Sequence, residues 1–201
     1  VQMEIRGGSA VTAQVSLEGK PISEGSVPIV GGRAVMMLPV PNPVLWDVGQ
    51  PNLYDLVLTL DTGDCVKSYF GMRSVAVHPD GLYLNGRPLF MRTILDQGYY
   101  PEGIYTAPTD EDLKNDIVLS MDLGFNGARF HQKAFEPRSL YWADKLGLLI
   151  MEDIPCFWGE PLPDTQAQYE IEMAEQIIRD RNHPSTFYWV IFNETWGLFH
   201  F

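Results

Sequence analysis

The spacing of apolar residues changes once along this chain of 201 residues, and that change limits the possible folds more than any other feature. Up to about Val77 the chain consists of short alternating runs separated by Gly, Pro and Asp, which is typical of antiparallel strands. From His78 onward, strand-like runs alternate with helical patterns. The sequence therefore predicts two domains, residues 1–77 and residues 78–201.

The first part has the pattern of an antiparallel β-sandwich. In residues 54–61, apolar side chains stand at every second position, which gives a strand one buried and one exposed face. Similar runs recur at short intervals: VQMEIR, TAQVSLE, RAVMMLPV, YDLVLTLD and YFGMRSVAV. Closely spaced short strands of this kind predict a sandwich of two sheets.

The second part has the pattern of repeated β/α units. The expected strands are FMRTILDQ, FNGARFH, LLIMEDIP and TFYWVIFNE. Thr109 is expected to cap the first helix, and the second is expected to run from Pro137 to Gly147. A third helix is expected over residues 167–179. Four such steps fit either a doubly wound sheet or half of a (β/α)8 barrel of ~250 residues.

The loop after the first of these strands distinguishes the two folds. It is LDQGYYPEG, which lacks the glycine-rich pattern that holds a dinucleotide phosphate. The sequence therefore favours the half-barrel over a doubly wound nucleotide enzyme.

Charge and cysteine content exclude several classes of partner. The chain has 14 Lys and Arg against 26 Asp and Glu, and its formal net charge of −12 repels nucleic acids and anionic membranes. Cys65 and Cys156 suggest neither a disulfide framework nor a zinc cluster. No metal, cofactor, nucleic-acid or membrane partner is expected, a neutral ligand such as a sugar is compatible, and the cellular compartment stays open.

Three motifs carry a resemblance to a known family. The first is D-R-N-H-P-S at 180–185, followed by Trp189 and by Asn193-Glu194, and it resembles the acid/base signature of glycoside hydrolase family 2. That family includes β-galactosidases, β-glucuronidases and β-mannosidases. The others are N-x-x-R ending at Arg129, with D-x-x-G at 144–147, and the stretch LWDVGQPNLYDLVLTL with YFGMRSV.

The resemblance implies a fold and an activity. The fold is a multi-domain β plus α/β arrangement, in which an immunoglobulin-like β-sandwich precedes the first four β/α units of a TIM (β/α)8 barrel. The activity is retaining hydrolysis of a terminal β-glycoside, with a β-galactoside ahead of a β-mannoside or β-glucuronide. A non-catalytic carbohydrate-binding or interaction module is the alternative, because sandwich domains often serve that purpose.

The same resemblance implies roles for individual residues. Glu194 is the expected general acid/base. The nucleophile is expected on a seventh barrel strand, so no residue of this chain takes that role and the chain alone is expected to be inactive. Asn193 is expected to bind the sugar 2-hydroxyl or to cap the strand. Arg129 is expected to orient catalytic carboxylates or to form a structural ion pair.

Further candidates lie where the expected strands end. His131 is a candidate sugar ligand or a structural histidine, and Asp96 and Gln97 are candidate sugar contacts or turn formers. Trp158 and Trp196 are candidates for a stacking platform, with core packing as the alternative for Trp158. Half a barrel also leaves strand edges open, so self-association into a homo-oligomer is a further expectation.

Overall fold

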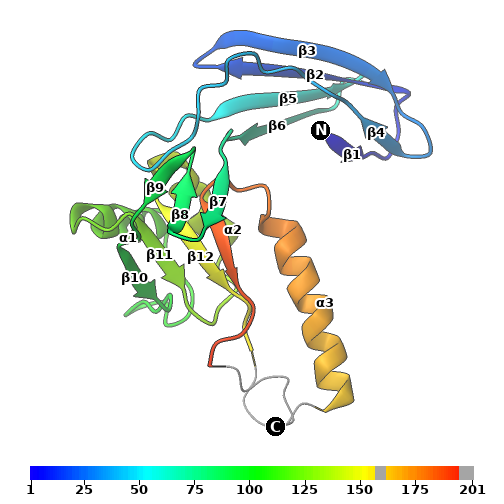
Figure 1. The fold of residues 1–201 in the computed structure, drawn as a ribbon. Coiled ribbons are helices and arrows are strands. Elements are labelled where there is room, and N and C mark those ends of the chain that lie inside the picture. Colours follow the sequence, from blue (N-terminus) through cyan, green and yellow to red (C-terminus); the bar gives the residue numbers. More distant parts are fainter. Residues whose placement is uncertain (157–161, 195–201) are drawn as a thin grey trace. The chain divides into compact units, whose positions relative to one another are not determined.

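The computed structural model describes residues 1–156 and 162–194, and the chain divides into two compact units (Figure 1). Unit 1 comprises Val1–Leu45 and Asn52–Met72, and unit 2 comprises Trp46–Pro51 and Arg73–Phe201. The domain limits at residues 77 and 78 stay a prediction. The described helices include none that is long and apolar enough to cross a membrane.

Unit 1 consists of two antiparallel sheets. One pairs β1 with β4, and the other has the order β3-β2-β5-β6. The core between them includes Ala13 and Val15 of β2 and Tyr54 and Leu56 of β5, all buried. These are alternate residues of each strand, as the sequence pattern predicted. The bounds are β1 (Gln2–Glu4), β2 (Ala10–Leu17), β3 (Lys20–Pro28), β4 (Arg33–Val35), β5 (Tyr54–Leu60) and β6 (Cys65–Phe70).

Two details of unit 1 and its exit correct the sequence interpretation. Strand β3 was missed, because KPISEGSVP has no apolar alternation; it lies at the edge of its sheet, where Pro21 is tolerated. The run YFGMRSVAV is two strands instead of one, since β6 ends at Phe70 and β7 begins at Val75. Between them, Arg73 donates hydrogen bonds to the carbonyls of Pro184 and Thr186.

Unit 2 contains a four-stranded parallel sheet in the order β10-β11-β12-β13. The predicted common direction of these four strands is confirmed, and their carboxyl ends meet at one edge (Figure 1). A small antiparallel sheet, β7-β8-β9, precedes it. The bounds are β7 (Val75–His78), β8 (Gly81–Leu84), β9 (Arg87–Leu89), β10 (Thr93–Asp96), β11 (Gly127–Phe130), β12 (Leu149–Asp153) and β13 (Thr186–Val190).

Three helices connect the parallel strands: α1 (Asp110–Asp122), α2 (Pro137–Leu146) and α3 (Pro163–Asp180). The predicted caps of the first two are confirmed. The Thr109 hydroxyl accepts a hydrogen bond from the backbone N–H of Asp112 (3.2 Å), and α2 begins at Pro137. Helix α3 begins earlier than predicted, at Pro163, because a proline is well suited to the first turn of a helix.

The core of unit 2 lies between the sheet and helices α1 and α2. Its members are Ile117, Ala128, Phe130, Phe135, Leu140, Ala143, Leu148 and Ile150. Trp46 is fully buried in the same unit, and its indole N–H donates to the carbonyl of Asp144 (2.8 Å). Gly147 ends α2 with a φ of 85°, and a Cβ there would lie 2.7 Å from Gly49 N, so only glycine fits. Helices α1 and α2 thus pack against the sheet through a continuous apolar core.

Candidate active site

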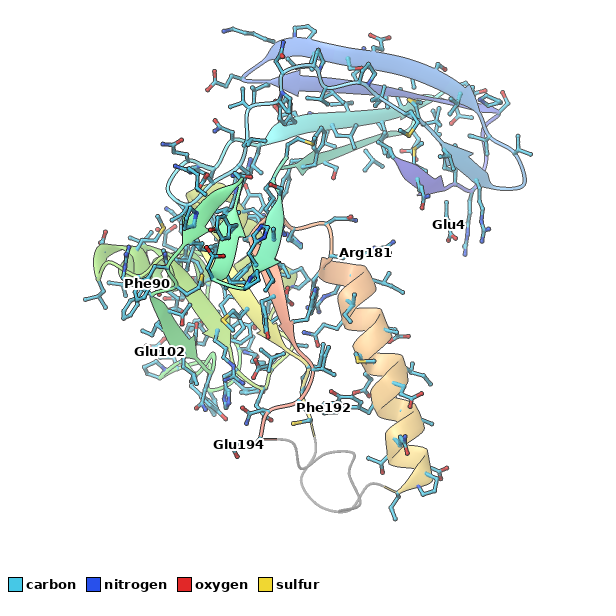
Figure 2. All side chains as sticks on the ribbon, in the orientation of Figure 1. Glu4, Phe90, Glu102, Arg181, Phe192 and Glu194 are labelled. Atoms are coloured by element: carbon cyan, nitrogen blue, oxygen red, sulfur yellow. The ribbon has the colours of Figure 1, made fainter. Side chains whose placement is uncertain are left out.

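A cavity of about 360 Å³ lies at the carboxyl ends of the parallel strands. In Figure 2, Glu194 lies beyond the end of β13. The lining residues come from the segments that follow β10, β11 and β13: Gln97, Tyr99, Tyr105, His131, Gln132, Asn193 and Glu194. This edge is where parallel α/β enzymes hold their active sites.

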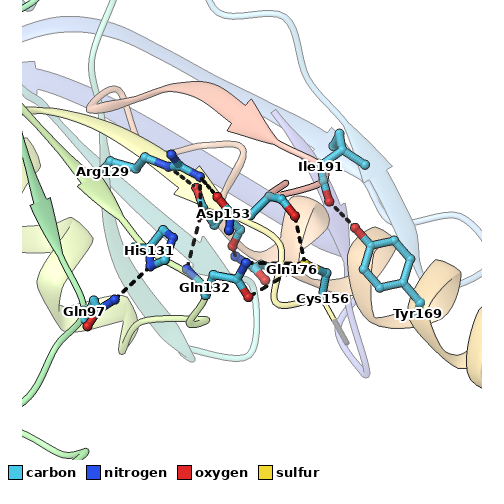
Figure 3. A network of polar contacts seen from close by, with 10 residues as sticks. Gln97, Arg129, His131, Gln132, Asp153, Cys156, Tyr169, Gln176 and Ile191 are labelled. Carbon is cyan, nitrogen blue, oxygen red and sulfur yellow. Dashed lines mark hydrogen bonds and ion pairs between the residues drawn. The ribbon is translucent and has the colours of Figure 1, made fainter. Parts of the chain in front are cut away.

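Arg129 of β11 is bonded to Asp153 of β12 (Figure 3) and to Asn193, which lines the cavity. Its Nε and Nη2 atoms donate to the two carboxylate oxygens of Asp153 at 2.9 and 2.8 Å, and Nη2 also donates to Asn193 Oδ1 at 2.8 Å. Asp153 is fully buried and also accepts from the backbone N–H of Gln132 (3.2 Å). A bidentate arginine pair fixes both position and orientation, so the Asn193 side chain is held in one place.

The two carboxylates that end β12 have different surroundings, because neighbouring residues of a strand point to opposite faces. Asp153 meets Arg129 as described. Glu152 is 2% exposed and accepts a hydrogen bond from the Thr186 hydroxyl (2.5 Å). Burial, with the neighbouring Asp180 carboxylate, raises the pKa of Glu152 to about 7. Glu152 is not among the residues that line the cavity.

The predicted sugar contacts of β10 and β11 lie in different places. Gln97 Nε2 donates to His131 Nδ1 (3.1 Å), and both residues line the cavity. Since Nδ1 accepts this bond, the Nε2 atom of His131 carries the ring proton and is a donor for a ligand. Asp96 instead accepts from the backbone N–H of Gly98 (2.7 Å) and faces a second cavity of about 420 Å³ beside Asp116. Burial raises the pKa of Asp96.

Two non-glycine residues of the lining have left-handed backbone conformations. Gln132 has a φ of 55° and Glu194 a φ of 59°. Such conformations cost energy and are concentrated at functional sites, where surrounding contacts maintain them. Here the Gln132 backbone is bonded to Asp153, and its side-chain amide lies 3.5 Å from Cys156 Sγ, which itself faces the carbonyl of Asn193 (3.8 Å).

Three lining residues were missed by sequence reasoning: Tyr99, Tyr105 and Gln132. The tyrosines had a usable signal, since the aromatic-rich loop GYYPEGIY follows a strand end directly. No such sequence signal identified Gln132 as a lining residue, because its position depends on a backbone turn. Trp158 and Trp196 lie outside the described residues. Within residues 1–156 and 162–194, no group of three metal-binding side chains occurs.

Comparisons with known proteins give the family. The model of "Glycosyl hydrolases family 2" matches residues 1–73. A β-galactosidase of Thermoanaerobacterium thermosulfurigenes is 34% identical over 148 residues, covering 72% of this chain and 21% of that protein. The chain belongs to glycosyl hydrolase family 2. It is therefore related to glycosidases, as its motifs indicated.

Other relatives extend over more of the chain. A putative β-glucuronidase of Formosa agariphila is 29% identical over 194 residues, covering 90% of this chain and 18% of that protein. The crystal structure of Parabacteroides merdae β-glucuronidase superposes with a TM-score of 0.84 at 27% identity, covering 92% of this chain and 24% of that one. The chain thus spans only about a fifth of the length of these curated relatives.

Proposed function

We propose that this chain is the part of a retaining β-glycosidase that carries the general acid/base, Glu194. The observation that carries the proposal is the position of Asn193 and Glu194 in a cavity at the carboxyl edge of a parallel sheet, with Asn193 tied to Arg129. In domain terms, we propose an immunoglobulin-like sandwich within residues 1–77 and the first four β/α units of a TIM barrel within residues 78–201.

Glu194 is suited to proton transfer by its access to the cavity. Its side chain is exposed, it follows directly on Asn193, and it exerts an electrostatic effect on Arg129. In a retaining mechanism, this carboxyl group protonates the departing glycosidic oxygen and later activates water. The partner carboxylate attacks the anomeric carbon from about 5–5.5 Å away, and we place it outside these 201 residues.

Asn193 and Arg129 prepare the site for the sugar. Because Asn193 Oδ1 accepts from Arg129, the Nδ2 group is the donor that this side chain offers to a ligand. A hydrogen bond to the sugar 2-hydroxyl strengthens in the transition state. Arg129 acts through Asn193 as a positioning residue, and Asp153 holds Arg129 in turn.

The polar character of the lining favours a neutral sugar. Among the described residues, the lining contains amides, a histidine, two tyrosines and Glu194, but neither lysine nor arginine. Arg129 is bonded to Asp153, and the Lys133 ammonium is bonded to backbone carbonyls. A sugar carboxylate buried without a cation would be costly. This supports a β-galactoside over a β-glucuronide as the substrate.

Substitution of Glu194→Gln in the full natural protein tests the proposal. Loss of the proton donor should lower kcat/KM about 100- to 10,000-fold for methyl and phenyl β-galactosides, whose leaving groups need protonation. The loss should be far smaller for 2,4-dinitrophenyl β-galactoside. Azide should then restore turnover of the dinitrophenyl substrate and yield the β-glycosyl azide.

The exposed residue Glu170, on α3, provides the matched control. Glu170→Gln should leave both classes of substrate unaffected. Equal losses for good and poor leaving groups in Glu194→Gln would show that the residue is not the acid/base. Proton NMR of the first product formed would show inversion if the mechanism were not retaining.

A further inference from the structure

Two tyrosines at the mouth of the cavity point to a subsite beyond the sugar that is cleaved. We propose that Tyr99 and Tyr105 bind the leaving group of the substrate and favour a leaving group with an aromatic or pyranose ring. Both residues line the cavity with Glu194, and their rings lie 5.3 Å apart at an angle of 53°. This inference rests on the proposed function.

The loop that carries these tyrosines is fixed by its own hydrogen bonds. The backbone groups of Tyr100 and Ile104 bond to each other in both directions, each at 2.9 Å. The Tyr100 hydroxyl donates to Asp116 Oδ2 on α1 (2.6 Å), and the Gly98 N–H donates to Asp96 (2.7 Å). The loop therefore presents Tyr99 and Tyr105 in defined positions, which lowers the entropic cost of binding a ligand.

Lys133 is bonded to both ends of the loop. It is only 6% exposed, and its ammonium group donates to the carbonyls of Tyr105 (2.8 Å) and Gly98 (3.2 Å), at the two ends of the loop. The same nitrogen lies 4.4 Å from the centre of the Tyr105 ring, as a cation–π contact. A buried lysine thus holds the ring of Tyr105 on one side.

The loop also has a strained backbone. Ile104 is a β-branched residue with a φ of 57°, a conformation that such residues rarely adopt. At Gly103, a Cβ atom would lie 1.8 Å from Thr106 O, so any other residue would distort the turn. Ile104 itself is 71% exposed and gains little from burial. Strain held in place without a packing benefit indicates that the loop shape serves a function.

The residues that line the cavity differ in their exposure to solvent, and this difference indicates where each part of the substrate binds. His131, Gln132 and Asn193 are half-buried and provide hydrogen-bonding groups, which suit the hydroxyls of an enclosed terminal sugar. Tyr99 and Tyr105 are 65% and 46% exposed. In an enzyme that removes terminal sugars, the leaving group extends toward solvent, where aromatic rings can pack against its flat face.

The test compares the binding of two uncleavable ligands to the full natural protein. Phenyl and methyl 1-thio-β-D-galactosides share a sugar and differ only in the leaving group, and titration calorimetry measures both dissociation constants. The same pair of β-glucuronides covers the other sugar class. Wild-type protein should bind the phenyl compound about fivefold more tightly than the methyl compound, as expected for a phenyl ring that packs against both tyrosines at once.

Removal of either ring should abolish that preference. In Tyr99→Ala and Tyr105→Ala the ratio should fall to about one, while Tyr99→Phe and Tyr105→Phe, which keep the ring, should retain it. Tyr83→Ala is the matched control, because Tyr83 lies on β8 and bonds to Asp80 (2.7 Å) outside the cavity lining. It should show the wild-type ratio.

The possible failures are distinguishable. If the ratio in the alanine variants equals the wild-type ratio, the tyrosines do not bind the leaving group, although the glycosidase proposal stands. If wild-type protein binds none of the four ligands, the proposed function fails and this inference fails with it.

Discussion

The parallel sheet of unit 2 carries two polar clusters that differ in their access to solvent. The cleft network consists of Arg129, Asp153, Asn193 and Glu194, and it opens into the cavity. The sealed cluster consists of Asp144, Glu152, Asp180 and His183, whose three carboxylates are at most 2% exposed. Asn193 and Glu194 of the cleft network line the cavity, whereas none of the four residues of the sealed cluster is in that lining.

The sealed cluster explains what most of the family motif does. Asp144 on α2 accepts hydrogen bonds from His183 Nδ1 (2.5 Å) and from the backbone N–H of Ser185 (2.9 Å). The Ser185 carbonyl accepts from Ile150 N (2.8 Å), which leads directly into the pairing of β12 with β13. Residues 180–185 therefore fix the start of β13, so that its far end presents Asn193 and Glu194 to the cavity.

The largest loss of stability is expected for substitutions in the sealed cluster. Asp144→Ala removes the buried carboxylate that accepts from His183 Nδ1 and from the Ser185 N–H, so the free energy of unfolding should fall by about 3 kcal/mol. Asp144→Asn, which keeps one acceptor, should lose less. Urea denaturation followed by fluorescence measures both.

Asp122→Ala, at an exposed position of α1, is the control and should change stability by less than about 0.5 kcal/mol. Below the unfolding transition, kcat of the Asp144 variants should stay within about threefold of wild type, because the pairing of β13 with β12 still directs Asn193 and Glu194 to the cavity. A large loss of kcat in protein of native stability would mean that the two clusters are not separate.

The sequence predicted the strands that carry the site but not which carboxylate faces it. Caps such as Thr109 and the glycine at 147 are local signals, and the parallel order followed from the β/α alternation. In LLIMED, however, consecutive apolar residues are buried on both faces, so no alternation shows whether Glu152 or Asp153 points to the cleft. The partner of Arg129 was therefore visible only in the structure.

The sequence marks the tyrosines as residues after a strand end, but it does not predict the shape of their loop. Its shape depends on the left-handed Ile104 and on Lys133, which lies 28 residues after Tyr105. A β-branched residue gives no turn signal, and a buried lysine is unexpected from composition. Contacts between distant segments, rather than local preference, determine this part of the site.

A smaller effect is expected in the cleft network, on activity rather than stability. Arg129→Lys keeps the charge but cannot bond Asp153 twice and Asn193 as well. A displaced Asn193 should lower kcat about 10- to 100-fold, with a lesser change in KM. Steady-state kinetics on an aryl β-galactoside measures kcat and KM separately.

Arg138→Lys is a close control, because Arg138 makes the same paired contact with Asp110 at an exposed position. It should leave kcat unaltered. If kcat is unaltered in Arg129→Lys as well, the ion pair of Arg129 has a structural role only and does not position Asn193 for catalysis.

The smallest predicted effect is the pH dependence that Glu152 gives to the sealed cluster. Its pKa of about 7 lies above the ordinary value of 4.5, so the folded state binds more protons than the unfolded state between those values. Stability from this group is therefore present at low pH and is lost as the pH rises through about 7. The raised pKa of His183, due to Asp144 despite burial, acts in the same direction.

Glu152→Gln separates the pH dependence due to Glu152 from that due to His183. Glutamine keeps an acceptor for the Thr186 hydroxyl and carries no charge. The variant should be more stable than wild type at pH 8 and about equally stable at pH 5, as measured by urea denaturation at both values. Glu175→Gln, exposed on the same helix as Asp180, should show no such difference. If the substitution changed the free energy of unfolding equally at pH 5 and pH 8, Glu152 would not titrate between these two pH values.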